Sequence, residues 1–187
     1  MNRNTLLLFF LVSVTAGLSW WLSDITSPEP AIPKRTEQFP DAYAKQLTVV
    51  SYDAQGLPHY RLKTPTMRHY EKDDTSELEQ PLMWQFNGDK PPWVVQGDKA
   101  VMTGDQDSLF MSGKVTIDRA SSPESAPYHI VTRDLTVNTV TVYAETEQRV
   151  RVLSNDHWVK GIGMQGWLKD PVRIKLLNKV RGYYELQ

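Results

Sequence analysis

Short runs of β-type residues are the feature that most constrains how this chain folds. From residue 47 onward the runs are rich in Val, Ile, Thr and aromatic residues, and Gly, Asp, Asn or Pro bounds each of them. Many alternate with period two, as Val115 and Ile117 do around Thr116. No segment after residue 25 carries an apolar stripe of helical period over three turns. We therefore expect an all-β, antiparallel sandwich, barrel or open β-roll.

A weak internal repeat favours stacked layers within this β domain. The runs SLFMSGKVTI around Val115, AETEQRVRVL around Val150 and RIKLLNKVRGYY around Val180 share one pattern. Each reads as a strand, a short turn with a basic residue, and a Val that leads a new strand. Repeats spaced as these three valines are, a few tens of residues apart, are typical of solenoid-like stacks in which a single layer cannot close a core alone. A β-meander can also produce three such copies by chance.

The N-terminus predicts a membrane anchor. Residues 6–22 are almost continuously apolar, and with Thr5 the expected span of residues 5–22 is at the short end of what crosses a bilayer as a helix. A cleavable signal peptide is the alternative, but Trp20 and Trp21 follow where a small-x-small cleavage site would be needed. Arg3 precedes the span and acidic residues follow it, which places the N-terminus in the cytoplasm.

Four prolines between residues 28 and 40 indicate an extended spacer. The expected organisation is an anchor in residues 1–25, a Pro-rich linker in residues 26–41 and a β domain in residues 42–187.

Composition excludes several classes of function. The net charge of -1 does not suggest a nucleic-acid partner, although residues 149–187 carry eight Lys or Arg against three acids. The absence of cysteine excludes disulfides and thiolate chemistry. The four histidines show no metal-ligand spacing, and no hydrolase, P-loop or dinucleotide motif occurs. We expect no catalytic residue, no metal and no cofactor.

Five stretches carry a resemblance to a known family. They are YDAQGLPHYRL (52–62), ELEQPLMWQFNGDKPPWVVQGDKAVMT (77–103), LFMSGKVTI (109–117), GIGMQG (161–166) and NKVRGYYE (178–185). Together with the anchor and the spacer, they resemble the LptC family of lipopolysaccharide export proteins. The resemblance implies a twisted antiparallel β-jellyroll, open as a β-roll, that is not an enzyme. It also implies a single-pass protein of the inner membrane whose C-terminal domain lies in the periplasm.

The resemblance further implies a role and partners. Lipopolysaccharide would come from an inner-membrane ABC transporter of the LptB/LptF/LptG type and pass to a periplasmic β-jellyroll protein of the LptA type. One alternative is a structural adaptor that docks a β-protein to the membrane without binding lipid. Another is a lipid-modifying hydrolase, which has no supporting motif.

Inward apolar positions are the candidates for contact with acyl chains. A closed core and an acyl groove have the same periodicity, so the sequence leaves open which of these side chains touch lipid. Leu82, Trp84 and Phe86 are expected to face the same way. The groove candidates are Leu109, Met111, Val115, Ile117, Leu135, Val137, Val142, Val150, Val152, Ile174 and Leu176.

The last strand and two glycines complete the candidate residues. An edge strand with free N–H and C=O groups can pair with another chain. In the family this edge receives the partner, which points here to Lys179, Val180, Arg181, Gly182 and Tyr184. Gly56 is expected in a turn with positive φ, and Gly161 at a bulge or a close backbone approach.

Overall fold

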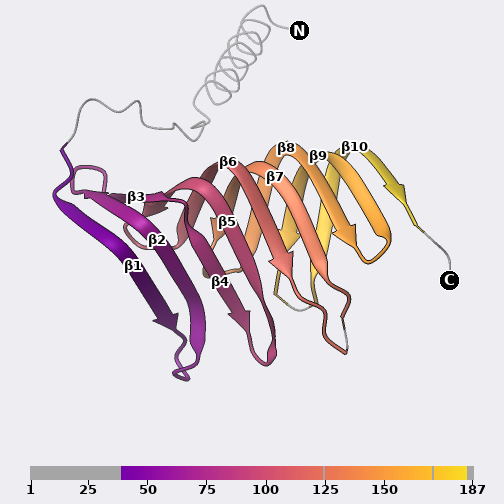
Figure 1. The fold of residues 1–187 in the computed structure, drawn as a ribbon, viewed down its shortest axis with the longest axis horizontal. Coiled ribbons are helices and arrows are strands. Elements are labelled where there is room, and N and C mark those ends of the chain that lie inside the picture. Colours follow the sequence, from indigo (N-terminus) through magenta and orange to yellow (C-terminus); the bar gives the residue numbers. More distant parts are fainter. Residues whose placement is uncertain (1–38, 124, 170, 185–187) are drawn as a thin grey trace, which may run out of the picture. The chain divides into compact units, whose positions relative to one another are not determined.

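The computed structural model describes residues 39–123, 125–169 and 171–184, and these fold as one antiparallel sheet of ten strands (Figure 1). The expected anchor and most of the expected linker lie outside the described residues, so both stay predictions. No helix of the described part is long and apolar enough to cross a membrane. The strands are β1 (Ala42–Tyr52), β2 (Pro58–Tyr70), β3 (Thr75–Glu79), β4 (Leu82–Asn87), β5 (Lys90–Thr103), β6 (Ser108–Arg119), β7 (Tyr128–Asn138), β8 (Tyr143–Ser154), β9 (His157–Trp167) and β10 (Arg173–Tyr183).

The strands pair almost entirely in chain order, which confirms the all-β antiparallel prediction. The sheet runs β1-β2-β3-β5-β6-β7-β8-β9-β10, and β4 pairs with β2 and β5 beside β3. The first half of β2 pairs with β4 and the second half with β3, so these two short strands share one position in the sheet. β1 and β10 lie at the two ends of the order, and among the described residues each pairs on one side only, which leaves it one free edge.

The long strands bend halfway along their length. The pairing register shifts within β5, β6, β7, β8 and β10, which marks a β-bulge or similar irregularity in each. A bulge bends a strand and increases its twist. Figure 1 shows the strands arching as a series from β1 to β10. Because each strand bends, buried side chains from both of its halves enter one apolar cluster.

Side-chain oxygens bond backbone groups at the bends. Asp134 has a φ of 48°, and its Oδ1 accepts a hydrogen bond from the N–H of Gly113 at 2.9 Å. Asp98 Oδ2 accepts from the N–H of Lys114 at 2.8 Å, and Thr146 Oγ1 donates to the carbonyl of Arg133 at 2.8 Å. These bonds provide partners for backbone groups at positions where the regular pairing is interrupted.

The repeat has a different structural basis from the one expected. The sequence predicted a turn before each of Val115, Val150 and Val180, and this prediction is wrong. The residues before each valine form a bulge within one continuous strand, which is β6, β8 or β10 respectively. The bulges use the positive φ that turns also use, as at Gly113 and Lys179. A sequence run read as two short strands is therefore one bent strand.

The face assignment of β4 is also corrected. Met83 and Gln85 are buried, whereas Leu82, Trp84 and Phe86 lie on the outward face and are half-buried. The outward-facing Lys63 and Arg61 of β2 pair opposite Leu82 and Trp84. Both phases of LMWQF contain apolar residues, so alternation alone could not choose between them. Inside, Gln85 Nε2 donates a hydrogen bond to the carbonyl of His59 at 3.0 Å.

Candidate functional site

An unbroken row of apolar and small residues crosses the interior face from one end of the sheet to the other. Residues paired directly across antiparallel strands point to the same face, so the register identifies the row. Ile117 of β6 stands between Val95 of β5 and Ile130 of β7. The complete row is Val49, Leu62, Met83, Val95, Ile117, Ile130, Val152, Val159 and Gly182.

The other halves of the bent strands carry further interior rows. One of them contains the two candidates Met111 and Leu135. Another contains Leu109, Val137 and Ile174. The full members are Met67, Leu78, Ala100, Met111 and Leu135 in the first, and Met102, Leu109, Val137, Ala144, Gly166 and Ile174 in the second.

All the groove candidates meet in one apolar interior. Eight are buried, namely Leu109, Met111, Val115, Ile117, Leu135, Val137, Val142 and Val150. Val152, Ile174 and Leu176 are partly buried and pack against that cluster. Val142 differs from the rest in lying just before β8, with a φ of 54°. Contact of these residues with lipid stays a prediction.

The central row is closed in the middle and more open toward its ends. Met83, Ile117 and Ile130 are fully buried, whereas Val49 and Val159 are half-buried and Gly182 is exposed. A side chain in the centre is covered by neighbouring strands on both sides, and one at the end has a neighbour on one side only. The apolar interior therefore reaches solvent near the free edges of β1 and β10.

The candidate partner edge is exposed. Gly182 pairs with Val159, and Val159 pairs with Val152, which packs against the core. Gly182 is therefore on the inward side of the sheet. Because side chains alternate along a strand, Val180 and Tyr184 are on the same side. Lys179 forms the bulge with a φ of 48°, and Arg181 pairs with Lys160 on the outer side. The ring of Tyr184 stacks on His157 at 4.2 Å. Binding of a partner here stays a prediction.

The two candidate glycines have the geometry expected of them. Gly56 has a φ of 81° in a turn where its N–H donates to the carbonyl of Asp53 at 3.0 Å. Gly161 is buried in β9, and a Cβ there would lie 3.1 Å from the carbonyl oxygen of Asn178 in β10. That position therefore allows the two backbones to approach closely.

Several interior residues were not among the candidates. Tyr60, Leu62, Trp93 and Met164 are buried in the same cluster. Period-two alternation marks Tyr60 and Leu62, and could have found them. Trp93 follows two prolines, and its indole Nε1 donates to the carbonyl of Leu168 at 2.9 Å, a contact across 75 residues that no local pattern indicates.

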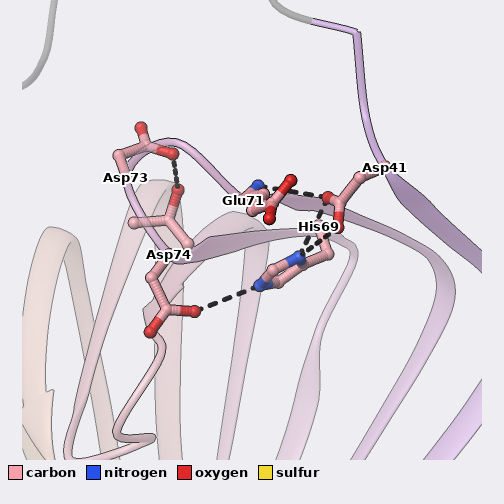
Figure 2. Close-up of polar contacts among 6 residues, drawn as sticks. Asp41, His69, Glu71, Asp73 and Asp74 are labelled. Atoms are coloured by element: carbon pink, nitrogen blue, oxygen red, sulfur yellow. Dashed lines mark hydrogen bonds and ion pairs between the residues drawn. The ribbon is translucent and has the colours of Figure 1, made fainter.

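A histidine joins two carboxylates where the described chain begins (Figure 2). His69 Nδ1 lies 3.0 Å from Asp41 Oδ1 and its Nε2 lies 3.2 Å from Asp74 Oδ1. The hydrogen bonds to Asp41 and then to Asp74 raise the pKa of His69. At Asp41, desolvation acts to raise the pKa of the carboxyl group. The hydrogen bond from His69 and backbone hydrogen bonds outweigh it and lower that pKa overall. The cluster ties the start of β1 to the turn between β2 and β3. No group of three or more His, Cys, Asp or Glu side chains in the described residues is arranged so that it could hold a metal ion.

Comparison with known proteins identifies the family. A model of the family described as "Lipopolysaccharide-assembly, LptC-related" matches residues 6–185. The chain belongs to the LptC family. The export system protein LptC of Escherichia coli K12 is 32% identical over 137 residues, which cover 73% of this chain and 70% of that protein. LptC of Shigella flexneri matches to the same extent. Members of the family are transport components and not enzymes, so the expectation of a non-enzymatic protein is confirmed.

A solved structure shares the fold. It is LptH of Pseudomonas aeruginosa, described as the LptA-homologous periplasmic component of the lipopolysaccharide transport device. The TM-score is 0.56 at 6% identity, and the match covers 68% of this chain and 95% of LptH. At that identity the likeness concerns the fold alone, and it supports the jellyroll-like β-roll that the LptC resemblance implied.

Proposed function

We propose that this protein binds lipopolysaccharide in its apolar interior and transfers it along the sheet. The row from Val49 to Gly182 carries the proposal, because apolar and small residues follow one another along it without a break between two free edges. Each methylene removed from water contributes roughly 0.8 kcal/mol, so several acyl chains are held strongly without any chemical reaction. Neighbouring row positions differ little in polarity, so a chain can move from one to the next.

The relatives support the place of this step in export. The matched relatives are named as LptC of the lipopolysaccharide export system, and LptH is described as a periplasmic component of a transport device. We propose that the chain accepts lipopolysaccharide from an inner-membrane ABC transporter of the LptB/LptF/LptG type. The lipid then passes to a periplasmic LptA-type protein, whose strand pairs with the free edge of β10.

The proposed location follows from the N-terminal sequence. The apolar residues 5–22 would anchor the chain in the inner membrane with its N-terminus in the cytoplasm. The prolines of residues 26–41 would hold the β domain away from the bilayer on the periplasmic side. This topology puts the roll in the compartment where the lipid has to travel.

Photo-crosslinking tests lipid contact directly. A photoreactive residue replacing Ile117 or Met111, both fully buried inside β6, is expected to form adducts with lipopolysaccharide in cells. The matched control is Thr116, which lies between them on the opposite face of the same strand. Adducts from Ile117 but not from Thr116 support the proposal. The adaptor alternative requires that neither position forms a lipid adduct while the protein still binds its periplasmic partner.

A further inference from the structure

Three cationic residues lie side by side on the outer face of the last three strands. Arg151 of β8 pairs with Lys160 of β9, and Lys160 pairs with Arg181 of β10. These three exposed side chains form a cationic row. The row is on the outer face, because Val152, next to Arg151 in β8, packs against the core. Part of the basic excess of residues 149–187 therefore lies in one line that ends at the free edge of β10.

Among the described residues, no carboxylate pairs with the cationic row. No ion pair joins Arg151, Lys160 or Arg181 to an acidic side chain of this part of the chain. Nζ of Lys160 lies 5.1 Å from the ring centre of Trp158, a contact that supplies no net negative charge. Like charges directly opposite each other in antiparallel strands are destabilising. The row is therefore a line of repulsive neighbours in the free domain.

The positions around the row do not supply the missing acid. On each side of it the same three strands carry another outward row without a carboxylate. One contains Leu153, Trp158 and Tyr183, and the other contains Arg149, Ile162 and Asn178. At its inner end the row meets the uncharged Val131 of β7. The position that remains open is the next one beyond Arg181, at the free edge of β10.

We propose that the cationic row selects the strand that docks on β10, by requiring an acidic residue opposite Arg181. The inference rests on the proposed docking of an LptA-type partner at this edge and adds the chemistry that the partner has to present. A docked strand continues each cross-strand row by one position, so its residue opposite Arg181 becomes the fourth member of the cationic row. A carboxylate there pairs with Arg181, whereas Lys or Arg would extend the line of like charges.

Charge reversal along the row tests this pairing. The measurement is the affinity of the full-length chain in detergent for the LptA-type partner of the same organism. Arg181→Glu is expected to weaken binding roughly twofold to thirtyfold, because one favourable pair is lost and one like-charge pair is gained. Since successive strands are about 4.8 Å apart, Lys160→Glu should weaken binding less, and Arg151→Glu least. Raising NaCl from about 0.1 M to about 1 M should reduce these differences, because the Debye length falls from about 10 Å to about 3 Å.

Lys175→Glu is the matched control on the same strand. Lys175 is exposed on the outer side of β10, but its row is mixed, because it pairs with Gln165, which in turn pairs with Glu145. The same change in net charge is made there outside a line of like charges, so the affinity is expected to stay close to that of wild type. A charge swap identifies the partner residue. When each acidic residue of the partner's docking strand is changed to Lys in turn, one change should restore binding to Arg181→Glu.

Thermal unfolding of the free chain separates selection from a structural role. Arg181→Glu places a carboxylate opposite Lys160, so the melting temperature of the free chain is expected to rise. Weaker binding together with a lower melting temperature would show that Arg181 maintains β10, and would overturn the proposal.

The binding results separate this inference from the proposed function. Normal binding by Arg181→Glu, equal weakening by all three reversals, or a swap that never restores binding would each overturn the inference while leaving the docking of the partner intact. Normal partner binding by Arg181→Glu with weaker binding of lipopolysaccharide would assign the row to phosphate groups of the lipid instead. Failure of wild type to bind the partner would contradict the proposed function itself, and this inference with it.

Discussion

At the scale of single residues, the His69 cluster predicts a dependence of stability on pH. Because Asp41 and Asp74 raise the pKa of His69, the folded protein holds this proton more tightly than the unfolded chain does. The stabilisation is therefore complete below the unfolded pKa of about 6.5 and is lost as pH rises through the higher folded pKa. Asp41 remains charged throughout this window, since its own pKa is lowered.

The change His69→Gln isolates this contribution. The difference in urea midpoint between wild type and His69→Gln is expected to be largest near about pH 6 and to shrink toward about pH 8. His59→Gln is the control, because Nε2 of His59 contacts the carbonyl of Thr139 and His59 forms no ion pair with a carboxylate of the described residues. A difference that stays constant over this range would mean that the proton on His69 does not stabilise the fold.

Gly161 predicts a packing effect at the same scale. Gly161→Val would place side-chain atoms against the Asn178 carbonyl and the Leu176 side chain, and this overpacking should cost roughly 1–3 kcal/mol in the free energy of unfolding. Gly56→Ala is the comparison, since no atom lies within 4 Å of its added Cβ and only the positive φ is disfavoured, by about 1 kcal/mol. Urea denaturation measures both. If both variants lost the same free energy of unfolding, the close contact between β9 and β10 at Gly161 would be contradicted.

The residue pattern alone predicted much of the interior. Where polar and apolar residues alternate, as from Leu109 to Ile117, the inward face was assigned correctly as buried. The assignment failed for Trp84, where both faces carry apolar residues and the neighbouring charged Arg61 decides the orientation. The burial of Arg119 was not predicted, because an arginine in a strand normally marks the solvent face. The aromatic rings that cover it belong to Trp93 of β5 and Tyr128 of β7, which are distant in sequence.

At the scale of elements, strand type was easier to predict than strand length. Ser112 to Lys114 and Asn178 to Lys179 have the composition of a turn, and the sequence pattern ended a strand at each. In the structure they are bulges, because the strands on either side continue the same pairings and hold the bend in place. A bulge depends on the register with neighbouring strands, which a local pattern does not contain.

The free edge of β10 predicts how the partner binds. Deleting residues 178–187 should abolish binding of the periplasmic LptA-type partner, because it removes the backbone groups that a further strand would pair with. Arg181→Pro tests the same edge with one change, by removing an N–H and restricting the backbone. Co-purification from membranes with the partner provides the measurement.

The opposite edge of the sheet provides the control for this prediction. Thr48→Pro introduces the same disruption into β1, an edge strand far from β10 in the sheet order, and should leave partner binding unchanged. Normal partner binding by the chain lacking residues 178–187 would require another edge for the handover.

At the scale of the whole domain, the roll behaves as a linear array of strands. Close backbone contacts are almost all between sheet neighbours, as in repeat proteins whose stability is a sum of local terms and neighbour interfaces. The central strands have neighbours on both sides and bury the fully covered part of the interior row, whereas β1 and β10 each have one neighbour. The two ends should therefore open more readily than the middle.

Hydrogen exchange measures this gradient and connects it to transfer. Backbone amides of β6 and β7 are expected to exchange slowest, and those of β1 and β10 fastest, because an end strand can separate without exposing the buried centre around Ile117 and Ile130. The two edges, where we propose that lipid enters and leaves, are then the parts that open at least cost. Adding the LptA-type partner should slow exchange in β10, which gains a second neighbour, and leave β1 unaffected. Uniform exchange across all ten strands would instead indicate one cooperative unit, in which lipid could pass an end of the roll only by unfolding the whole domain.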